Sequence, residues 1–210
     1  MNLPNRLSLF RIYMVPVFLG LLLLSETKLV EKQPEFWQGV VRLVALALVI
    51  VVAITDWLDG KIARERRLIT NLGKLIDPLA DKVFVTAALV IFAEMRLIPA
   101  WAVIIVIARE FLITGLRSLA ADAGRVIAAD RLGKHKMGWQ LALIICVLVA
   151  LAARDFLRSA GKWDNLRENY HGMALFSGLI WIPLIVTVVL TVISGWSYIY
   201  ANRDLFKGQI

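Results

Sequence analysis

Four aspartates in this chain stand at spacings that could build a metal site. Asp56 and Asp59 are three residues apart, and Asp77 and Asp81 are four residues apart. Either spacing places both carboxylates of a pair on one face of a helix. Carboxylates this close repel one another, and a divalent cation between them relieves the repulsion. Because ligands made only of oxygen favour hard cations, the two pairs predict a site for Mg²⁺ or Mn²⁺, with enough carboxylates for two ions.

Phosphoryl transfer is the chemistry that such a site favours, because two cations can act on the two sides of a displacement. Small residues beside the acids leave room for a bulky ligand: Gly60 and Ala63 follow the first pair, and Gly73 precedes the second. Arg64 can offer a forked donor to phosphate oxygens. A membrane ion transporter is the alternative from another class, since carboxylates inside a membrane also form ion paths.

The elements that must position these residues are predicted to be membrane-spanning helices. Of the 210 residues, 60% are hydrophobic and 19% are charged, and the mean hydropathy is +0.73. A helix needs roughly 20 mainly apolar residues to cross the hydrocarbon core of a membrane. The sequence therefore predicts an all-α integral membrane bundle, made of a single domain over residues 1–210. Six spans are expected, at about 8–25, 37–58, 76–95, 98–120, 135–153 and 173–200.

Two local features of this bundle follow from the residue pattern. The first acid pair ends the second span and the second pair begins the third, with a loop of about 15 residues expected between them. Antiparallel packing of these spans would bring all four carboxylates together. Before the first span, Leu3, Leu7 and Phe10 could share a helical face, which predicts a short N-terminal interfacial helix.

The net charge of +8 is explained by loops rather than by a nucleic-acid partner. Lys and Arg are concentrated in residues 61–74 and 125–136, between the spans. Positive loops are typical of the cytoplasmic side of a membrane protein, where they also meet anionic headgroups. The acid pairs and both chain ends are therefore expected to face the cytoplasm. The single cysteine, Cys146, excludes an internal disulfide and a cysteine-based metal site.

The acid-rich stretch resembles the signature of the CDP-alcohol phosphotransferase family. The chain reads D-W-L-D-G-K-I-A-R, then eight residues, then G-K-L-I-D-P-L-A-D. The family pattern is D-x-x-D-G-x-x-A-R, a short gap, and G-x-x-x-D-x-x-x-D, and all eight fixed positions are filled. The segments NLPNRLSLFRIYMVP, LIDPLADK and GKHK are similar to bacterial members that make phosphatidylglycerol phosphate. The resemblance covers about residues 1–140 by motif.

The resemblance implies a reaction in which an alcohol attacks the β-phosphorus of a CDP-alcohol and displaces CMP. For the similar bacterial members, the donor is CDP-diacylglycerol and the acceptor is sn-glycerol 3-phosphate. Phosphatidylglycerol, inositol phosphate and serine remain as alternative acceptors for the same chemistry. The resemblance also implies a homodimer in the inner (cell) membrane, in contact with membrane lipids.

The resemblance further implies roles for individual residues. Asp56, Asp59, Asp77 and Asp81 are expected to ligate the metal ions, and Asp81 is also the expected general base for the acceptor hydroxyl. The residues expected at the CDP site are Asn5, Asp59, Gly60, Ala63, Arg64 and Gly73.

The acceptor's phosphate requires cations, and four lie near the cytoplasmic ends of the fourth and fifth spans: Arg109, Arg117, Lys134 and Lys136. Arg109 and Arg117 are about two helical turns apart, so both can face one pocket. The alternative for each is an ordinary cation at the membrane boundary. Glu110 is expected to pair with a neighbouring cation. Relatives commonly have G-K-x-K-T before the fifth span, whereas this chain has Met137 in place of the threonine.

Overall fold

The computed structural model describes residues 3–26, 35–66, 71–122 and 131–203. Side chains are described throughout these ranges except at residues 3–8, 26, 57, 59–66, 71–81, 122, 131, 132 and 134.

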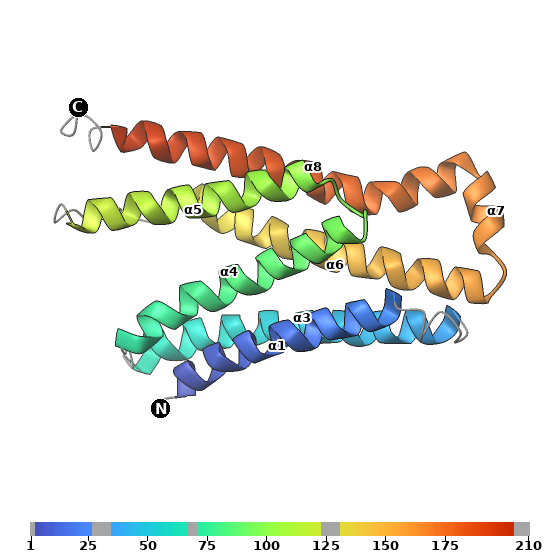
Figure 1. Cartoon of the computed structure of the whole chain (residues 1–210), viewed down its shortest axis with the longest axis horizontal. Helices are drawn as coiled ribbons and strands as arrows, with labels where there is room; N and C mark the ends of the chain where they lie inside the picture. Colours follow the sequence, from blue (N-terminus) through green and yellow to red (C-terminus); the bar gives the residue numbers. More distant parts are fainter. Residues whose placement is uncertain (1–2, 27–34, 67–70, 123–130, 204–210) are drawn as a thin grey trace.

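Within those ranges the chain is helical apart from short connections, which confirms the all-α prediction. Helices α1 and α3 lead into α4 and α5, and α6 is followed by the short α7 and the long α8 (Figure 1). Their bounds are α1 Leu3–Glu26, α3 Glu35–Arg66, α4 Asn71–Glu94, α5 Ala100–Asp122, α6 Arg131–Ser159, α7 Trp163–Glu168 and α8 Tyr170–Ala201.

Each of the six predicted spans coincides with one of the long helices, either fully inside it or within two residues of its end. The short helix α7 was not predicted from the sequence. Three helices contain stretches long and apolar enough to cross a membrane, at Glu35–Asp56, His135–Ser159 and Tyr170–Ala201. A shorter apolar stretch in α1 covers Leu9–Ser25. This search covers only the described parts of the chain, so the count of six spans stays a prediction.

The predicted loop of about 15 residues between the acid pairs is wrong. Helix α3 continues to Arg66 and α4 begins at Asn71, so four residues separate the two helices. The thickness of the membrane limits the apolar part of a helix but not the helix itself. Residues 61–66, KIARER, are mostly good helix formers, and they extend α3 beyond its apolar part.

The predicted interfacial helix is not separate from the first span. The structure has one continuous helix, α1, from Leu3 to Glu26. Pro16 lies inside this helix. The amphipathic start and the apolar run are therefore parts of one element.

Helix α6 lies at the centre of the packing. It packs against α3 on one side and α8 on the other, while α1 packs against both α3 and α4. Half of the apolar stretch of α6 is buried, compared with 28% of the corresponding stretches of α3 and α8. Fully buried side chains such as Leu143, Leu148 and Leu151 join α6 to the core.

Large apolar side chains cover much of the outside of the bundle. Trp101, Phe111 and Leu175 are 56%, 74% and 76% exposed. Single exposed apolar residues are normal on soluble proteins, but many such residues together indicate contact with lipid or with another protein. The outer surface therefore fits the predicted membrane environment.

A tight turn joins α4 to α5. The amide of Leu97 donates to the carbonyl of Phe92 at 2.9 Å, and that of Arg96 donates to the carbonyl of Ala93 at 3.0 Å. Arg96 has a φ of 56°, in the left-handed region. This is the Schellman arrangement that ends many helices, here with arginine where glycine is usual. From this turn the two helices diverge toward the other end of the molecule (Figure 1).

The helix ends that carry most of the predicted site residues lie at or toward that other end. Figure 1 shows the start of α1, the end of α3, the start of α4, the end of α5, the start of α6 and the end of α8 at the same end of the bundle. The up-and-down course of the long helices thus brings segments far apart in the sequence together.

Candidate active site

Asp56 is the predicted metal ligand whose side chain the structure describes. It lies on α3, where the guanidinium of Arg11 on α1 donates to its Oδ1 at 2.5 Å. The side chain of Arg11 is 2% exposed and that of Asp56 is 37% exposed. A buried arginine therefore neutralises the part of Asp56 that faces the protein, while the carboxylate stays accessible.

The other predicted metal ligands lie on helices, as expected. Asp59 follows Asp56 on α3, and Asp77 and Asp81 lie in the first turns of α4. Their side chains are outside the described part, so their approach to one another stays a prediction. Among the described side chains, no three His, Cys, Asp or Glu residues gather closely enough to hold a metal ion. The carboxylate of Asp56 has the oxygen chemistry that Mg²⁺ or Mn²⁺ requires.

The predicted CDP-binding residues lie on the same helices. Their backbone is helical, but their side-chain positions are outside the description, so this set stays a prediction. They are Asn5 on α1, Asp59, Gly60, Ala63 and Arg64 on α3, and Gly73 on α4.

Three residues form a buried ionic group that we call the Glu110 cluster: Arg109 and Glu110 on α5, and Lys136 on α6. Glu110 makes ion pairs with both cations, and Nη1 of Arg109 donates to its Oε1 at 3.1 Å. The side chains of Lys136 and Arg109 are 3% and 12% exposed. The structure thus brings together two of the predicted acceptor-site cations and confirms that Glu110 pairs with neighbouring cations.

Arg109 passes close to two glycines, and one of them, Gly195, leaves space that its side chain occupies. A methyl group on Gly195 of α8 would lie 3.3 Å from Cγ of Arg109, and one on Gly133 of α6 would lie 3.8 Å from its Nη2. The first distance is tight for carbon atoms. Arg109 therefore extends from α5 along the backbone of α8 toward the start of α6.

Arg117 lies on the same side of α5 as Arg109. Its Nε donates to the hydroxyl of Tyr198 on α8 at 3.2 Å, and its guanidinium lies 5.8 Å from the centre of the tyrosine ring. Tyr198 is buried. Helix α8 therefore supports both predicted arginines. The side chain of the fourth predicted cation, Lys134, lies outside the described residues.

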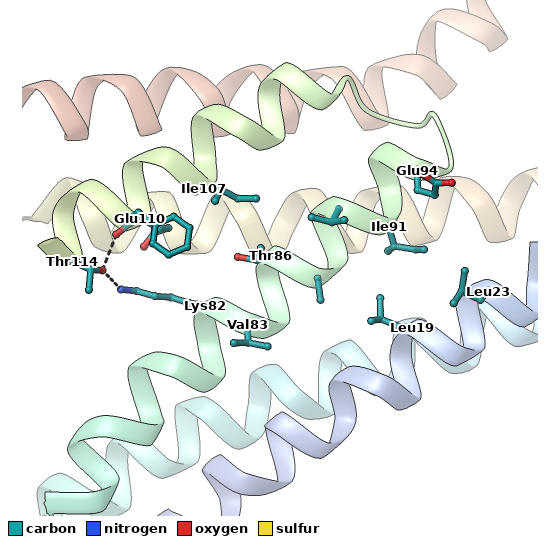
Figure 2. A pocket seen from close by; sticks show the side chains of 13 residues that line it. Leu19, Leu23, Lys82, Val83, Thr86, Ile91, Glu94, Ile107, Glu110 and Thr114 are labelled. Carbon is teal, nitrogen blue, oxygen red and sulfur yellow. Dashed lines mark hydrogen bonds between the residues drawn. The ribbon is translucent and has the colours of Figure 1, made fainter.

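Lys82 is a further cation in this region, on α4 directly after Asp81. Its Nζ donates to Oγ1 of Thr114 on α5 at 2.6 Å (Figure 2). Thr114 in turn donates to the backbone carbonyl of Glu110 at 2.7 Å. This chain of hydrogen bonds connects the helix of the metal-ligand candidates with the Glu110 cluster.

Lys82, Glu110 and Thr114 line one part of a cavity of about 840 Å³ between α1, α4 and α5 (Figure 2). Leu19 and Leu23 of α1 lie along another wall. The cavity is mostly apolar, and its charged groups lie near its two ends: Lys82 and Glu110 at one, Glu94 at the other.

A second buried ion pair lies near the opposite end of the bundle, and we call it the closed pair. Arg42 of α3 pairs with Asp155 of α6, and their side chains are 1% and 0% exposed. Arg42 also donates to the carbonyl of Leu151 at 3.3 Å. Arg154 adds a contact to Asp155 at 3.2 Å. Both acid and base are thus enclosed by protein.

The sequence reading missed Arg11, Lys82 and Tyr198. A signal existed for Arg11, because an arginine in an apolar helix requires an anionic or polar partner. Lys82 could have been found from its place beside Asp81. Tyr198 offered no signal, since it lies among Trp196 and Tyr200, and such aromatic residues near a helix end are typical of a membrane boundary.

Comparison with known proteins places the chain within one family of enzymes. The model of the CDP-alcohol phosphatidyltransferase family matches residues 1–193. A Bacillus subtilis protein named CDP-diacylglycerol–glycerol-3-phosphate 3-phosphatidyltransferase is 37% identical over 98% of this chain and 97% of its own length. Proteins of the same name from Escherichia coli K12 and Rickettsia typhi are 32% and 29% identical, over 96% and 98% of this chain and 95% and 99% of their own lengths.

Proposed function

Because this chain belongs to the CDP-alcohol phosphatidyltransferase family, we propose that it transfers a phosphatidyl group from CDP-diacylglycerol to sn-glycerol 3-phosphate. The products are phosphatidylglycerol phosphate and CMP. The observation that carries the proposal is similarity over nearly the whole chain to proteins named for this reaction. The complete eight-position signature, carried on α3 and α4, supports the same chemistry.

In the proposed reaction, the acceptor hydroxyl attacks the phosphorus that carries diacylglycerol. The new oxygen–phosphorus bond forms as the bond to the CMP phosphate breaks, and the bonding electrons leave with CMP. Asp81 accepts the hydroxyl proton, which requires a carboxylate within hydrogen-bond reach of the acceptor. The work of the remaining residues is to position the two substrates and to stabilise charge.

Asp56, Asp59, Asp77 and Asp81 would hold Mg²⁺ or Mn²⁺, as two ions. When bound, the metal supplies neutralisation of the diphosphate charge. Arg11 keeps Asp56 in place through the ion pair between α1 and α3. The CDP group would lie beside Asp59, Gly60, Ala63, Arg64 and Gly73, with Asn5 reaching it from α1.

The acceptor's phosphate is assigned to Arg109, Arg117, Lys134 and Lys136. The Glu110 cluster supports this, because Arg109 and Lys136 approach one another there from two helices. We place the enzyme in the inner membrane as one domain with six spans, with the site open to the cytoplasm, and as a homodimer.

The test is release of CMP by the purified protein from CDP-diacylglycerol with glycerol 3-phosphate and Mg²⁺ or Mn²⁺. Asp81→Asn should lower kcat by about 100-fold or more, the range that general bases contribute. Asp164→Asn, at an exposed position on α7, is the matched control. Full activity of Asp81→Asn would reject the assigned base.

The acceptor is tested with a panel in the same assay: glycerol 3-phosphate, phosphatidylglycerol, inositol phosphate and serine. Of these four acceptors, we expect only glycerol 3-phosphate to support CMP release from CDP-diacylglycerol. Faster release with another acceptor would keep the reaction class and reject the proposed substrate.

A further inference from the structure

The charged ammonium of Lys82 has a neutral hydrogen-bond partner. In the described part of the chain, its ammonium donates to the hydroxyl of Thr114 at 2.6 Å. An ammonium has three donors, and an anionic acceptor adds a charge–charge attraction that a neutral hydroxyl cannot provide. The observed bond therefore leaves Lys82 able to bind an anion more strongly than it binds Thr114.

The surroundings of Lys82 are strongly positive. Arg109 and Arg117 repel the charge of Lys82. Lys82 and Arg109 likewise repel the charge of Lys136. Glu110 is the carboxylate that the described side chains place in contact with this group. Among the described side chains, these four cations therefore outnumber the one carboxylate, and a phosphate monoester of about two negative charges would complement them.

We propose that Lys82 is a further binding residue for the phosphate of the acceptor. The inference rests on the proposed function and extends it, because it assigns to α4 a part in holding the acceptor. Lys82 directly follows Asp81, the assigned base, so one helix would contact both the reacting hydroxyl and the phosphate of the same molecule.

Space for an anion exists beside Lys82. The residue lines the cavity of about 840 Å³ together with Glu110 and Thr114, so its ammonium is not enclosed by packed side chains (Figure 2). Binding requires only that the ammonium exchange the hydroxyl of Thr114 for a phosphate oxygen. Thr114 keeps its own bond to the carbonyl of Glu110.

The experiment compares wild type with Lys82→Met and Lys82→Arg, with Lys162→Met at an exposed position as the control. CMP release is measured while either glycerol 3-phosphate or CDP-diacylglycerol is varied. Lys82→Met should raise the KM for glycerol 3-phosphate about tenfold or more, as expected for loss of a charged hydrogen bond. The KM for the donor should change less than about twofold, and Lys82→Arg should recover most of the loss. A raised donor KM, or a lower kcat with unchanged KM for the acceptor, would overturn the proposal.

A second variant keeps the test valid if Lys82→Met does not fold. Thr114→Val removes the neutral partner and leaves the cation in place, so the KM for glycerol 3-phosphate should stay the same or fall. A rise in that KM with unchanged donor KM would show that the Lys82–Thr114 bond is needed for acceptor binding, and would reject the exchange described above.

Binding of inorganic phosphate, measured by calorimetry in detergent, separates the two levels of inference. Weaker binding by Lys82→Met than by wild type supports the phosphate contact even if glycerol 3-phosphate proves not to be the acceptor. Equal binding by the two proteins, together with activity of wild type on glycerol 3-phosphate, rejects the phosphate contact of Lys82. The proposed function is then unaffected.

Discussion

The closed pair and the Glu110 cluster lie at opposite ends of the bundle, and each joins a carboxylate to buried cations. They differ in how far the charges are enclosed by protein. In the closed pair, Arg42 and Asp155 are both sealed from solvent. In the Glu110 cluster the cations are mostly buried, but the side chain of Glu110 is 22% exposed and lines a cavity. One group is sealed within the protein, whereas in the other the cations outnumber the carboxylate, as far as the described side chains show, and a cavity lies beside them.

The difference shows how to separate a structural ion pair from a binding site. Burial of a charge is costly, so a sealed charge must have its partner within the protein. Cations that outnumber their carboxylate beside a cavity can instead be completed by a ligand. The comparison predicts that variants of the closed pair will change stability, and that variants of the Glu110 cluster will change substrate binding.

The largest effect is expected from Asp155→Asn. The variant leaves the buried guanidinium of Arg42 without its carboxylate, which should lower the free energy of unfolding by about 3–5 kcal/mol. Thermal unfolding in detergent measures the change, with Asp164→Asn as the exposed control. The activity of the molecules that remain folded should be close to that of wild type. A folded, stable variant with a raised acceptor KM would contradict the comparison.

Lys136→Met should act on binding rather than on stability. Removal of the ammonium should raise the KM for glycerol 3-phosphate by roughly 10–100-fold, the cost of a charged hydrogen bond to phosphate. Glu110 keeps its pair with Arg109, so the unfolding temperature should fall less than in Asp155→Asn. Steady-state kinetics with each substrate varied provide the measurement, and Lys162→Met is the control. An unchanged acceptor KM would remove Lys136 from the site.

The smallest effect is expected from Glu110→Gln. Its effect on the KM for glycerol 3-phosphate should be opposite in sign to that of Lys136→Met. The carboxylate competes with an incoming phosphate for Arg109 and Lys136. Its neutralisation should therefore lower the KM for glycerol 3-phosphate, about two- to fivefold, with a steeper dependence on salt. Titrations of the acceptor at two ionic strengths test this. A raised KM would mean that Glu110 serves mainly to hold the cations in position.

The sequence was sufficient for the helices and for part of the site. Apolar runs near 20 residues locate the long helices, because a predicted membrane span needs an apolar stretch of about that length. Arg109 and Lys136 were recognisable because a phosphate requires cations and both lie near the cytoplasmic ends of predicted spans, and Glu110 was recognisable as a partner for a neighbouring cation. The loop between the acid pairs was predicted wrongly because hydropathy marks where a membrane ends and not where a helix ends.

Contacts between distant helices could not be predicted in this way. The pairing of Arg11 with Asp56 joins residues 45 positions apart, and that of Arg42 with Asp155 joins residues 113 positions apart. Both depend on which faces of α1, α3 and α6 meet. Helical periodicity identifies the faces, but packing decides which of them come together.

The turn between α4 and α5 makes these helices two arms joined at one end. Lys82 lies about 13 residues, or roughly 20 Å of helix, from that turn. A rotation of α4 by about 5° around the turn would therefore move Lys82 by roughly 2 Å while leaving Arg96 almost in place. The hydrogen bond between Lys82 and Thr114 joins the two helices partway along their lengths, so it resists their separation at a distance from the turn where a small rotation already gives a large displacement.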